Sequence, residues 1–183
     1  MSTRIERAVL HAAEAALAHL VMTSKMANAK LISEGTLYET IDHTLRGHNA
    51  TWVNHEHKVQ LGDPTAIKDS GDYKRVDFGM RHGETVTLIE LVIASRTKLK
   101  TTVDVATDIE KLVRSTPLYK SEVFASVAYL IVLNIATEDA HPKTGNIQWY
   151  DYPEATDVNC IATYKYASPK FVRTAAVFRV KRG

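Results

Sequence analysis

The spacing of apolar residues predicts two helices at the start of the chain. Apolar residues recur at helical intervals from Ile5 to Leu20, after a Thr3-x-x-Glu6 pattern that is typical of a capping box. We therefore expect a first helix over about residues 4–22. A second capping-box pattern, Thr36-x-x-Glu39, precedes Ile41 and Leu45 and predicts a second helix ending near Arg46, with Gly47 as its C-cap.

Alternation with a period of two predicts strands from residue 51 onward. Residues 51–61 form the first expected strand, and one face of it carries Val53, His55, His57, Val59 and Leu61. Tyr73 to Arg96 is typical of a β-hairpin, with Arg81-His82-Gly83 as the turn. Its second half, Val86 to Ala94, is almost continuously apolar, as in a central strand buried on both faces.

The remaining elements alternate between helix and strand. A third helix opens at Asp104 or Thr107 and stops before Pro117, and a strand lies within 123–136. Further strands are expected at 146–150, 158–166 and 171–180. A strand, helix, strand unit after a meander predicts a mixed sheet covered by helices, hence an α/β fold. We expect a single domain over 1–183, with N-terminal helices at 4–46, a core at 51–136 and C-terminal strands at 146–180.

Two acidic residues in the hairpin are the first candidates for chemistry. Glu90 stands in the middle of the apolar strand, where an ionised carboxylate is costly unless it is paired. Asp77 lies on the partner strand. Two carboxylates on neighbouring strands offer the hard oxygen ligands that Mg²⁺ or Mn²⁺ prefers. The alternative is a structural salt bridge to Arg75 or Lys74.

The stretches Val76-Asp77-Phe78 and Leu88-Ile89-Glu90-Leu91 resemble the core of the PD-(D/E)XK nuclease superfamily. The resemblance covers about residues 33–136, which follow the order of core elements in that superfamily. It implies a restriction-endonuclease-like fold in which Asp77 and Glu90 hold the metal. It also implies a third acid from the helix before the first strand, a position that Glu39 matches, although its place in the capping-box pattern explains Glu39 as well.

The sequence departs from the superfamily pattern at the motif lysine, where Val92 stands. Some members move this lysine to a neighbouring element. Lys111 on the third helix, and Lys74 and Lys98 at the strand ends, are the candidates, and Lys111 is the one we carry forward as a catalytic residue. The other reading is a site that has lost catalysis.

Two further patterns have a structural and a functional interpretation. His55-x-His57 places two imidazoles on one strand face, but no Cys or His nearby in sequence completes a zinc site, so we expect a buried, hydrogen-bonded pair. Arg173, Arg179 and Lys181 share a face of the last strand. They either follow a phosphate backbone or form a solvated basic edge.

Composition narrows the class of protein. The 183 residues are 45% hydrophobic and 24% charged, with a net charge of +2, which fits a globular protein and allows nucleic-acid binding. Cys160 is the single cysteine, which excludes an internal disulfide and fits a reducing compartment. No apolar run is long enough to span a membrane. The N-terminus lacks the layout of a signal peptide, so we expect a cytoplasmic protein.

These patterns lead to two hypotheses of different class. The first is a nuclease, dependent on Mg²⁺ or Mn²⁺, that hydrolyses phosphodiester bonds in DNA or RNA, with Asp77 and Glu90 as ligands. The second is a catalytically inactive protein of the same fold that binds nucleic acid or serves as an assembly module. The sequence leaves open the type of nucleic acid and whether the protein works as a homodimer.

Overall fold

The computed structural model describes residues 3–26, 34–48, 50–61, 73–94, 102–134, 158–168 and 172–182. Within these ranges the chain forms three helices, namely α1 (Arg4–Met26), α2 (Glu34–Gly47) and α3 (Thr102–Arg114). It also forms eight strands. They are β1 (Trp52–Leu61), β2 (Tyr73–His82), β3 (Thr85–Ala94), β4 (Ser115–Pro117), β5 (Val123–Phe124), β6 (Val127–Asn134), β7 (Val158–Ala167) and β8 (Val172–Lys181).

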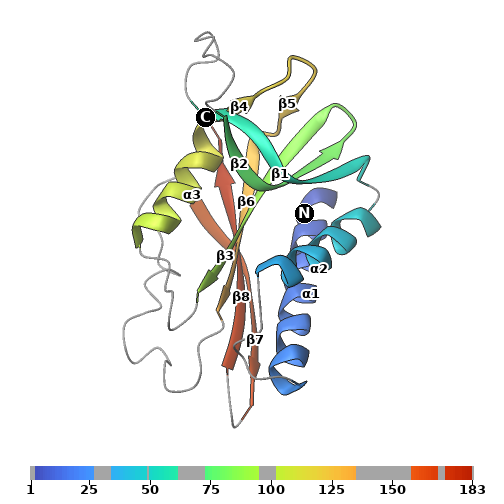
Figure 1. Ribbon diagram of the computed structural model, residues 1–183, viewed down its shortest axis with the longest axis vertical. Coiled ribbons are helices and arrows are strands. Elements are labelled where there is room, and N and C mark those ends of the chain that lie inside the picture. Colours follow the sequence, from blue (N-terminus) through green and yellow to red (C-terminus); the bar gives the residue numbers. More distant parts are fainter. Residues whose placement is uncertain are drawn as a thin grey trace.

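All eight strands belong to one mixed sheet. The order is β4-β1-β2-β3-β6-β8-β7, with β5 paired to β3. β3 runs parallel to β5 and β6, whereas the other pairs are antiparallel. The sheet is strongly curled, with α1 and α2 on one face and α3 on the other (Figure 1). This confirms the α/β class and the mixed sheet flanked by helices.

The two faces of the sheet have separate apolar cores. One core contains the buried sides of α1 and α2, together with Phe78, Ile89 and Leu91. The other contains the buried side of α3, together with Leu88 and Val92. β3 contributes to both, which confirms that it is a central strand buried on both sides. We call these the α1–α2 face and the α3 face.

The ends of the helices differ in part from the sequence predictions. The Thr3 hydroxyl accepts a hydrogen bond from the Glu6 N–H at 3.1 Å, as a capping box requires, and α1 continues to Met26. The second capping box is wrong, because α2 begins at Glu34 and Thr36 therefore lies inside the helix. An N-cap residue must itself be outside the helical conformation.

The alternation of β1 and β2 is interrupted in the middle of both strands. Glu56 has a left-handed backbone conformation, with φ of 48°. The regular pairing of β1 with β2 omits Glu56 and Asp77, which stand opposite each other. Side chains before this point on β1, such as Val53, pack on the α1–α2 face, whereas Val59 beyond it packs on the α3 face.

The same change of face occurs in β2 and corrects one sequence prediction for β1. Val76 packs on the α3 face, whereas Phe78 and Met80 pack on the α1–α2 face. His55 and His57 were expected on one face as a hydrogen-bonded pair, and this is wrong. The side chain of His55 is 39% exposed and contacts Asp42 of α2, whereas His57 is buried on the other side of the kink.

The segment after α3 contains two short strands that the sequence analysis did not predict. α3 ends at Arg114, and the chain continues directly into β4, which pairs with the end of β1. β5 pairs with the start of β3. The strands expected at 158–166 and 171–180 are present as β7 and β8, and the one expected at 146–150 lies outside the described residues.

The last strand is not an edge of the sheet, and of its three basic residues Arg179 and Lys181 are exposed whereas Arg173 is not. β8 lies between β6 and β7, and Arg173 is 2% exposed. Burial lowers the pKa of Arg173. Arg179 faces α1, where its guanidinium lies 3.5 Å from the Glu6 carboxylate. Among the described residues, no helix combines the length and the apolar character needed to cross a bilayer.

Candidate active site

Asp77 lies where β2 and β3 separate. The paired register of these strands ends at Phe78 opposite Ile89, and the next pair would be Asp77 with Glu90. Beyond this point the Asp77 carboxylate replaces the backbone, because its Oδ2 accepts the Leu91 N–H at 2.7 Å. The Asp77 carboxylate therefore lies between β2 and β3 where their pairing ends, and the Leu91 N–H fixes its position.

Tyr38 fixes the other oxygen of Asp77. The Tyr38 hydroxyl, on α2, donates to Asp77 Oδ1 at 2.8 Å, and its ring stands edge-on to Phe78 with the centroids 5.2 Å apart. The Leu91 N–H and the Tyr38 hydroxyl thus take one lone-pair direction on each carboxylate oxygen, and each oxygen has a second. Asp77 is oriented from two elements, with capacity left for a ligand.

Glu90 contacts Asp77 and is almost fully buried. Its residue exposure is 2%, and a side-chain hydrogen bond joins the two carboxyl groups. Burial, the charge of Asp77 and this hydrogen bond together raise the pKa of Glu90 to about 9, although Lys111 acts in the opposite direction. Glu90 therefore keeps its proton at neutral pH, as a buried carboxyl beside another carboxylate does.

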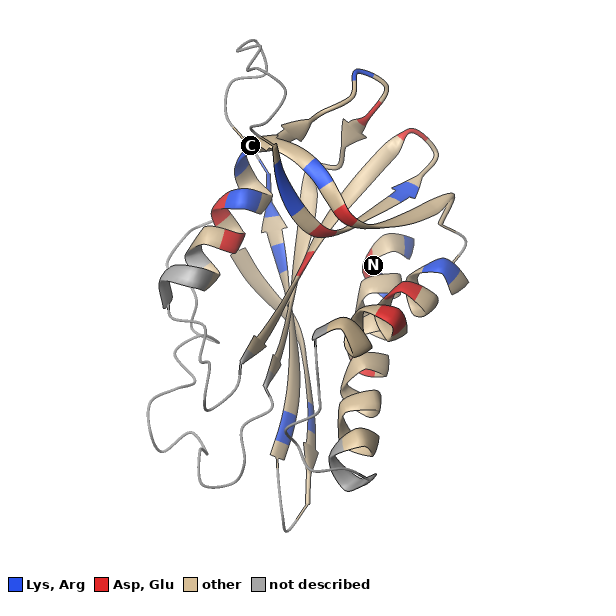
Figure 2. Cartoon of the chain, viewed as in Figure 1, with Lys and Arg blue, Asp and Glu red and all other residues tan. Residues whose placement is uncertain are grey.

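Lys111 reaches this pair from α3. Its ammonium contacts Glu90 Oε1 and lies 3.4 Å from Asp108 Oδ1. Burial lowers the pKa of Lys111, but Glu90 and the nearby charges of Asp108 and Asp77 outweigh burial and raise it. Lys111 is therefore a cation held against the acidic pair. Figure 2 shows both signs of charge on α3 and acidic residues on the strands beside it.

The structure separates the other sequence candidates from this cluster. Glu39 is exposed on α2, and no three acidic, His or Cys side chains of the described residues gather as a metal-binding group, so Glu39 does not join Asp77 and Glu90. Lys74 is exposed on β2, and Lys98 lies outside the described residues. Val92 is 1% exposed and packs with the α3 core.

Tyr38 is the residue that the sequence analysis missed, and helical phase would have identified it. Leu37, Ile41 and Leu45 form the buried stripe of α2. Tyr38 lies three residues before Ile41 and therefore beside this stripe, whereas Glu39, two residues before Ile41, points away from it. The same argument applies to α3, where Asp108 and Lys111 flank the stripe of Val105, Ile109 and Leu112.

The cluster has the composition of a site for a hard divalent cation. Two carboxylates in contact repel each other once both are ionised, and a cation that replaces the Glu90 proton removes this repulsion. Mg²⁺ is commonly bound by one or two protein carboxylates, with water and substrate phosphate completing its coordination. Asp77 and Glu90 are therefore the residues that could hold Mg²⁺ or Mn²⁺.

Comparison with known proteins adds no assignment. No protein-family model matches the sequence, and no curated protein and no solved structure shows a significant match to the chain.

Proposed function

We propose that the protein is a metal-dependent nuclease that hydrolyses phosphodiester bonds in nucleic acid. The observation that carries the proposal is the contact between Asp77 and Glu90 at the opening between β2 and β3, with the Lys111 ammonium against Glu90. Two acids and a cation in this arrangement match the parts that the PD-(D/E)XK resemblance implies. The cation comes from a helix and not from the strand position held by Val92.

Each residue has a defined task in this proposal. Asp77, oriented by Tyr38 and the Leu91 N–H, holds one side of the metal, and Glu90 gives up its proton to hold the other. The bound metal would activate a water molecule and stabilise charge on the phosphate. Lys111 is placed to orient that water or to stabilise the negative charge that develops on phosphate oxygens.

Cleavage and metal binding test the proposal with isosteric variants. Wild-type protein should cleave single-stranded or duplex DNA or RNA with Mg²⁺ or Mn²⁺ and bind Mn²⁺ in calorimetric titrations. Asp77→Asn and Glu90→Gln should abolish both. Lys111→Met should lower turnover by about 10²–10⁴-fold, the usual contribution of such groups, and leave Mn²⁺ binding in place.

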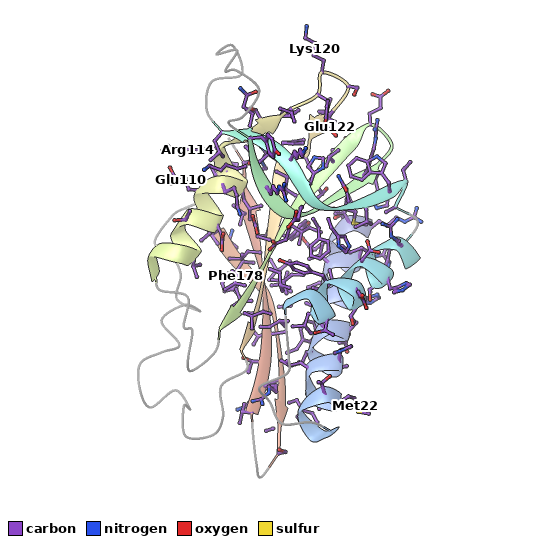
Figure 3. All side chains as sticks on the ribbon, in the orientation of Figure 1. Met22, Glu110, Arg114, Lys120, Glu122 and Phe178 are labelled. Atoms are coloured by element: carbon purple, nitrogen blue, oxygen red, sulfur yellow. The ribbon has the colours of Figure 1, made fainter. Side chains whose placement is uncertain are left out.

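Glu110→Gln is the matched control for these variants. Glu110 is on α3 next to Lys111 in sequence, but its side chain is 55% exposed and pairs with Arg114 on the outer side of the helix, as Figure 3 shows. It should behave as wild type in both assays. Absence of Mn²⁺ binding and of cleavage in the wild-type protein would contradict the proposal.

One observation favours the alternative, a nuclease-fold protein that binds or assembles without catalysis. Glu90 is 2% exposed and already paired with Lys111. In that case the pair serves as an internal ion pair that holds α3 to β3. Wild-type protein should then bind nucleic acid or a partner without Mn²⁺ uptake, and Glu90→Gln should change stability alone.

A further inference from the structure

A cavity lies beside the kink in β1. Its volume is about 570 Å³, within the usual range for small-molecule sites. Its lining residues come from one continuous run of β1, from β2 and from the segment between β4 and β5, and they include Trp52, His57, Lys58, Arg75, Tyr119 and Glu122. The α3 core and the cluster around Glu90 do not contribute to this lining.

The cavity contains a buried donor and a buried acceptor that the fold does not use. His57 is 2% exposed, and the Glu122 side chain is 8% exposed. His57 Nε2 and Glu122 Oε2 lie 3.6 Å apart, and neither has a hydrogen-bond partner among the described residues. Buried polar atoms are normally satisfied, and this donor and acceptor stop just short of a hydrogen bond to each other, so a ligand that enters from the cavity can satisfy both.

The neighbours of His57 fix its ring and its tautomer. Asn54 Nδ2 lies 3.5 Å from His57 Nδ1, and donation by this amide leaves the imidazole proton on Nε2. The ring lies over Gly79, where an added Cβ would come within 2.6 Å of the imidazole. Trp52 packs beside it, with ring centroids 5.5 Å apart. Nε2–H is therefore a preoriented donor next to an indole.

The pKa shifts of these two groups favour a neutral ligand at this end of the cavity. Burial lowers the pKa of His57, and burial raises the pKa of Glu122 despite the nearby charge of Arg81. Both groups are thus shifted toward their uncharged forms, which does not favour a salt bridge between them. Cations are present at the rim, where Arg75 pairs with Glu56 and Lys58 lies over Tyr73.

We propose that this cavity binds one unpaired nucleobase of a nucleic-acid strand. A base edge carries adjacent donors and acceptors, which suits the His57 Nε2–H and Glu122 Oε2 pair, and a flat ring suits the indole of Trp52. The rim cations Lys58 and Arg75 suit the phosphates on either side of that base. The proposal rests on the nuclease function, since a nucleic-acid substrate is what brings a base here.

The position of the cavity relative to the candidate active site supports this assignment. Glu56 lines the cavity and stands across from Asp77 in the β1–β2 pairing. His57 covers Gly79, which pairs with Leu88, and Glu90 lies two residues further along β3 on the same α3 face. A strand whose phosphate lies at Asp77 and Glu90 would therefore pass this cavity with a neighbouring base.

The fluorescence of Trp52 tests base binding without metal and without cleavage. In a Trp149→Phe background, Trp52 is the single tryptophan. Short single-stranded homopolymers of each base, titrated with no divalent metal present, should quench it with clear preference for one or two bases. A duplex containing the preferred base should bind about tenfold more weakly or worse, because pairing occupies the edge that is read.

Variants of the donor and acceptor separate base reading from charge attraction. Glu122→Gln and His57→Gln should each lower the affinity for the preferred homopolymer about tenfold and reduce the discrimination between bases. The exposed acid Glu84, in the turn between β2 and β3, provides the control Glu84→Gln, which should leave binding unchanged. In Figure 3, Glu122 lies on the inner side of its segment, whereas Lys120 extends outward. Circular dichroism confirms that each variant is folded.

Three results would overturn the base pocket. The first is equal affinity for all four homopolymers, and the second is equal affinity for single strands and duplex. The third is quenching of Trp52 fluorescence by Zn²⁺ that is lost in His57→Gln, because this would indicate a metal site instead of a base pocket. Cleavage tests the nuclease proposal separately. If the protein cleaves nucleic acid but does not discriminate between bases, only the base-pocket proposal is refuted. If the protein binds the base but cleaves nothing, the base-pocket proposal stands and the nuclease proposal is refuted.

Discussion

At the scale of single residues, the proton that Glu90 holds in the folded protein makes stability depend on pH. In the unfolded chain Glu90 loses its proton near the ordinary value of 4.5, whereas in the folded protein it keeps the proton up to about pH 9. Between these values the folded state binds more protons. Stability contributed by Glu90 is therefore complete below the ordinary pKa and is lost as pH rises toward 9.

We predict that the free energy of unfolding falls between pH 7 and 9 in wild-type protein, and falls less in Glu90→Gln. The amide imitates the protonated acid and does not titrate. Histidines with lowered pKa values, such as His57, are already neutral in both states in this range. The raised pKa of Glu122 acts in the same direction as that of Glu90, so the difference between the two proteins isolates Glu90. Urea unfolding at each pH measures it, and parallel pH curves for the two proteins would contradict the assignment.

The position of the cation can be tested by moving it from the helix to the strand. Val92 is two residues beyond Glu90 on the same face of β3 and is 1% exposed. With Lys111 present, Val92→Lys should lower the melting temperature, since it buries a second ammonium in an apolar core. In a Lys111→Met background, the same change should restore part of the lost cleavage. Equal cleavage in Lys111→Met with and without Val92→Lys would show that a cation beside Glu90 is not used.

At the scale of elements, the kink at Glu56 decides which face of the sheet each side chain of β1 lies on. It stands opposite Asp77 of the candidate active site and precedes His57 of the cavity. An alternating sequence looks the same whether or not a strand changes face, so the pattern of β1 predicted His55 and His57 on one side. A left-handed residue in the middle of the strand reverses the alternation beyond it, and only glycine adopts that conformation without cost. Glu56 carries no sequence signal for it.

We predict that two substitutions at Glu56 differ in their effect on stability. Glu56→Gly should leave stability within about 1 kcal/mol of wild type, because glycine tolerates positive φ. Glu56→Ile should destabilise by about 1–3 kcal/mol, because a β-branched residue is strained there. The exposed ion pair with Arg75 contributes little to either value. Lys58→Ile, at an exposed neighbour on β1, is the control. Chemical denaturation gives the values, and a stable Glu56→Ile protein would show that the kink is not required.

The residues of the candidate active site differ in how well they could be predicted from the sequence. Asp77 and Glu90 could be chosen from sequence because an acid inside an apolar strand is costly without a partner. Lys111 could only be named among several lysines, since the distance between a helix and a strand depends on packing. Tyr38 was accessible from helical phase but was hidden by the apparent capping box at Thr36.

At the scale of the whole molecule, Arg182, which directly follows β8, connects α3 with the segments around β4 and β5. Arg182 donates to Leu112 O at 2.8 Å and to Ala125 O at 3.2 Å, and it also bonds Ser115 O. Its guanidinium lies 4.9 Å from the Phe124 ring centroid. These bonds join the end of α3, the start of β4 and the segment between β5 and β6. Strands as short as β4 and β5 carry too few residues for a period, which is why the sequence did not reveal them.

We predict that Arg182→Met destabilises the protein by about 2–4 kcal/mol, because backbone carbonyls in a partly buried position lose their donors. Arg182→Lys should recover only part of this loss, since an ammonium cannot match the planar fork that serves several carbonyls. Because α3 carries Lys111, both variants should also lower cleavage when assayed well below their melting temperatures, with Mn²⁺ binding by Asp77 and Glu90 retained. Lys181→Met, at the exposed neighbouring residue, is the control. Loss of stability with unchanged cleavage would show that α3 keeps its place against β3 through its own apolar contacts, and that Arg182 supports the fold without positioning Lys111.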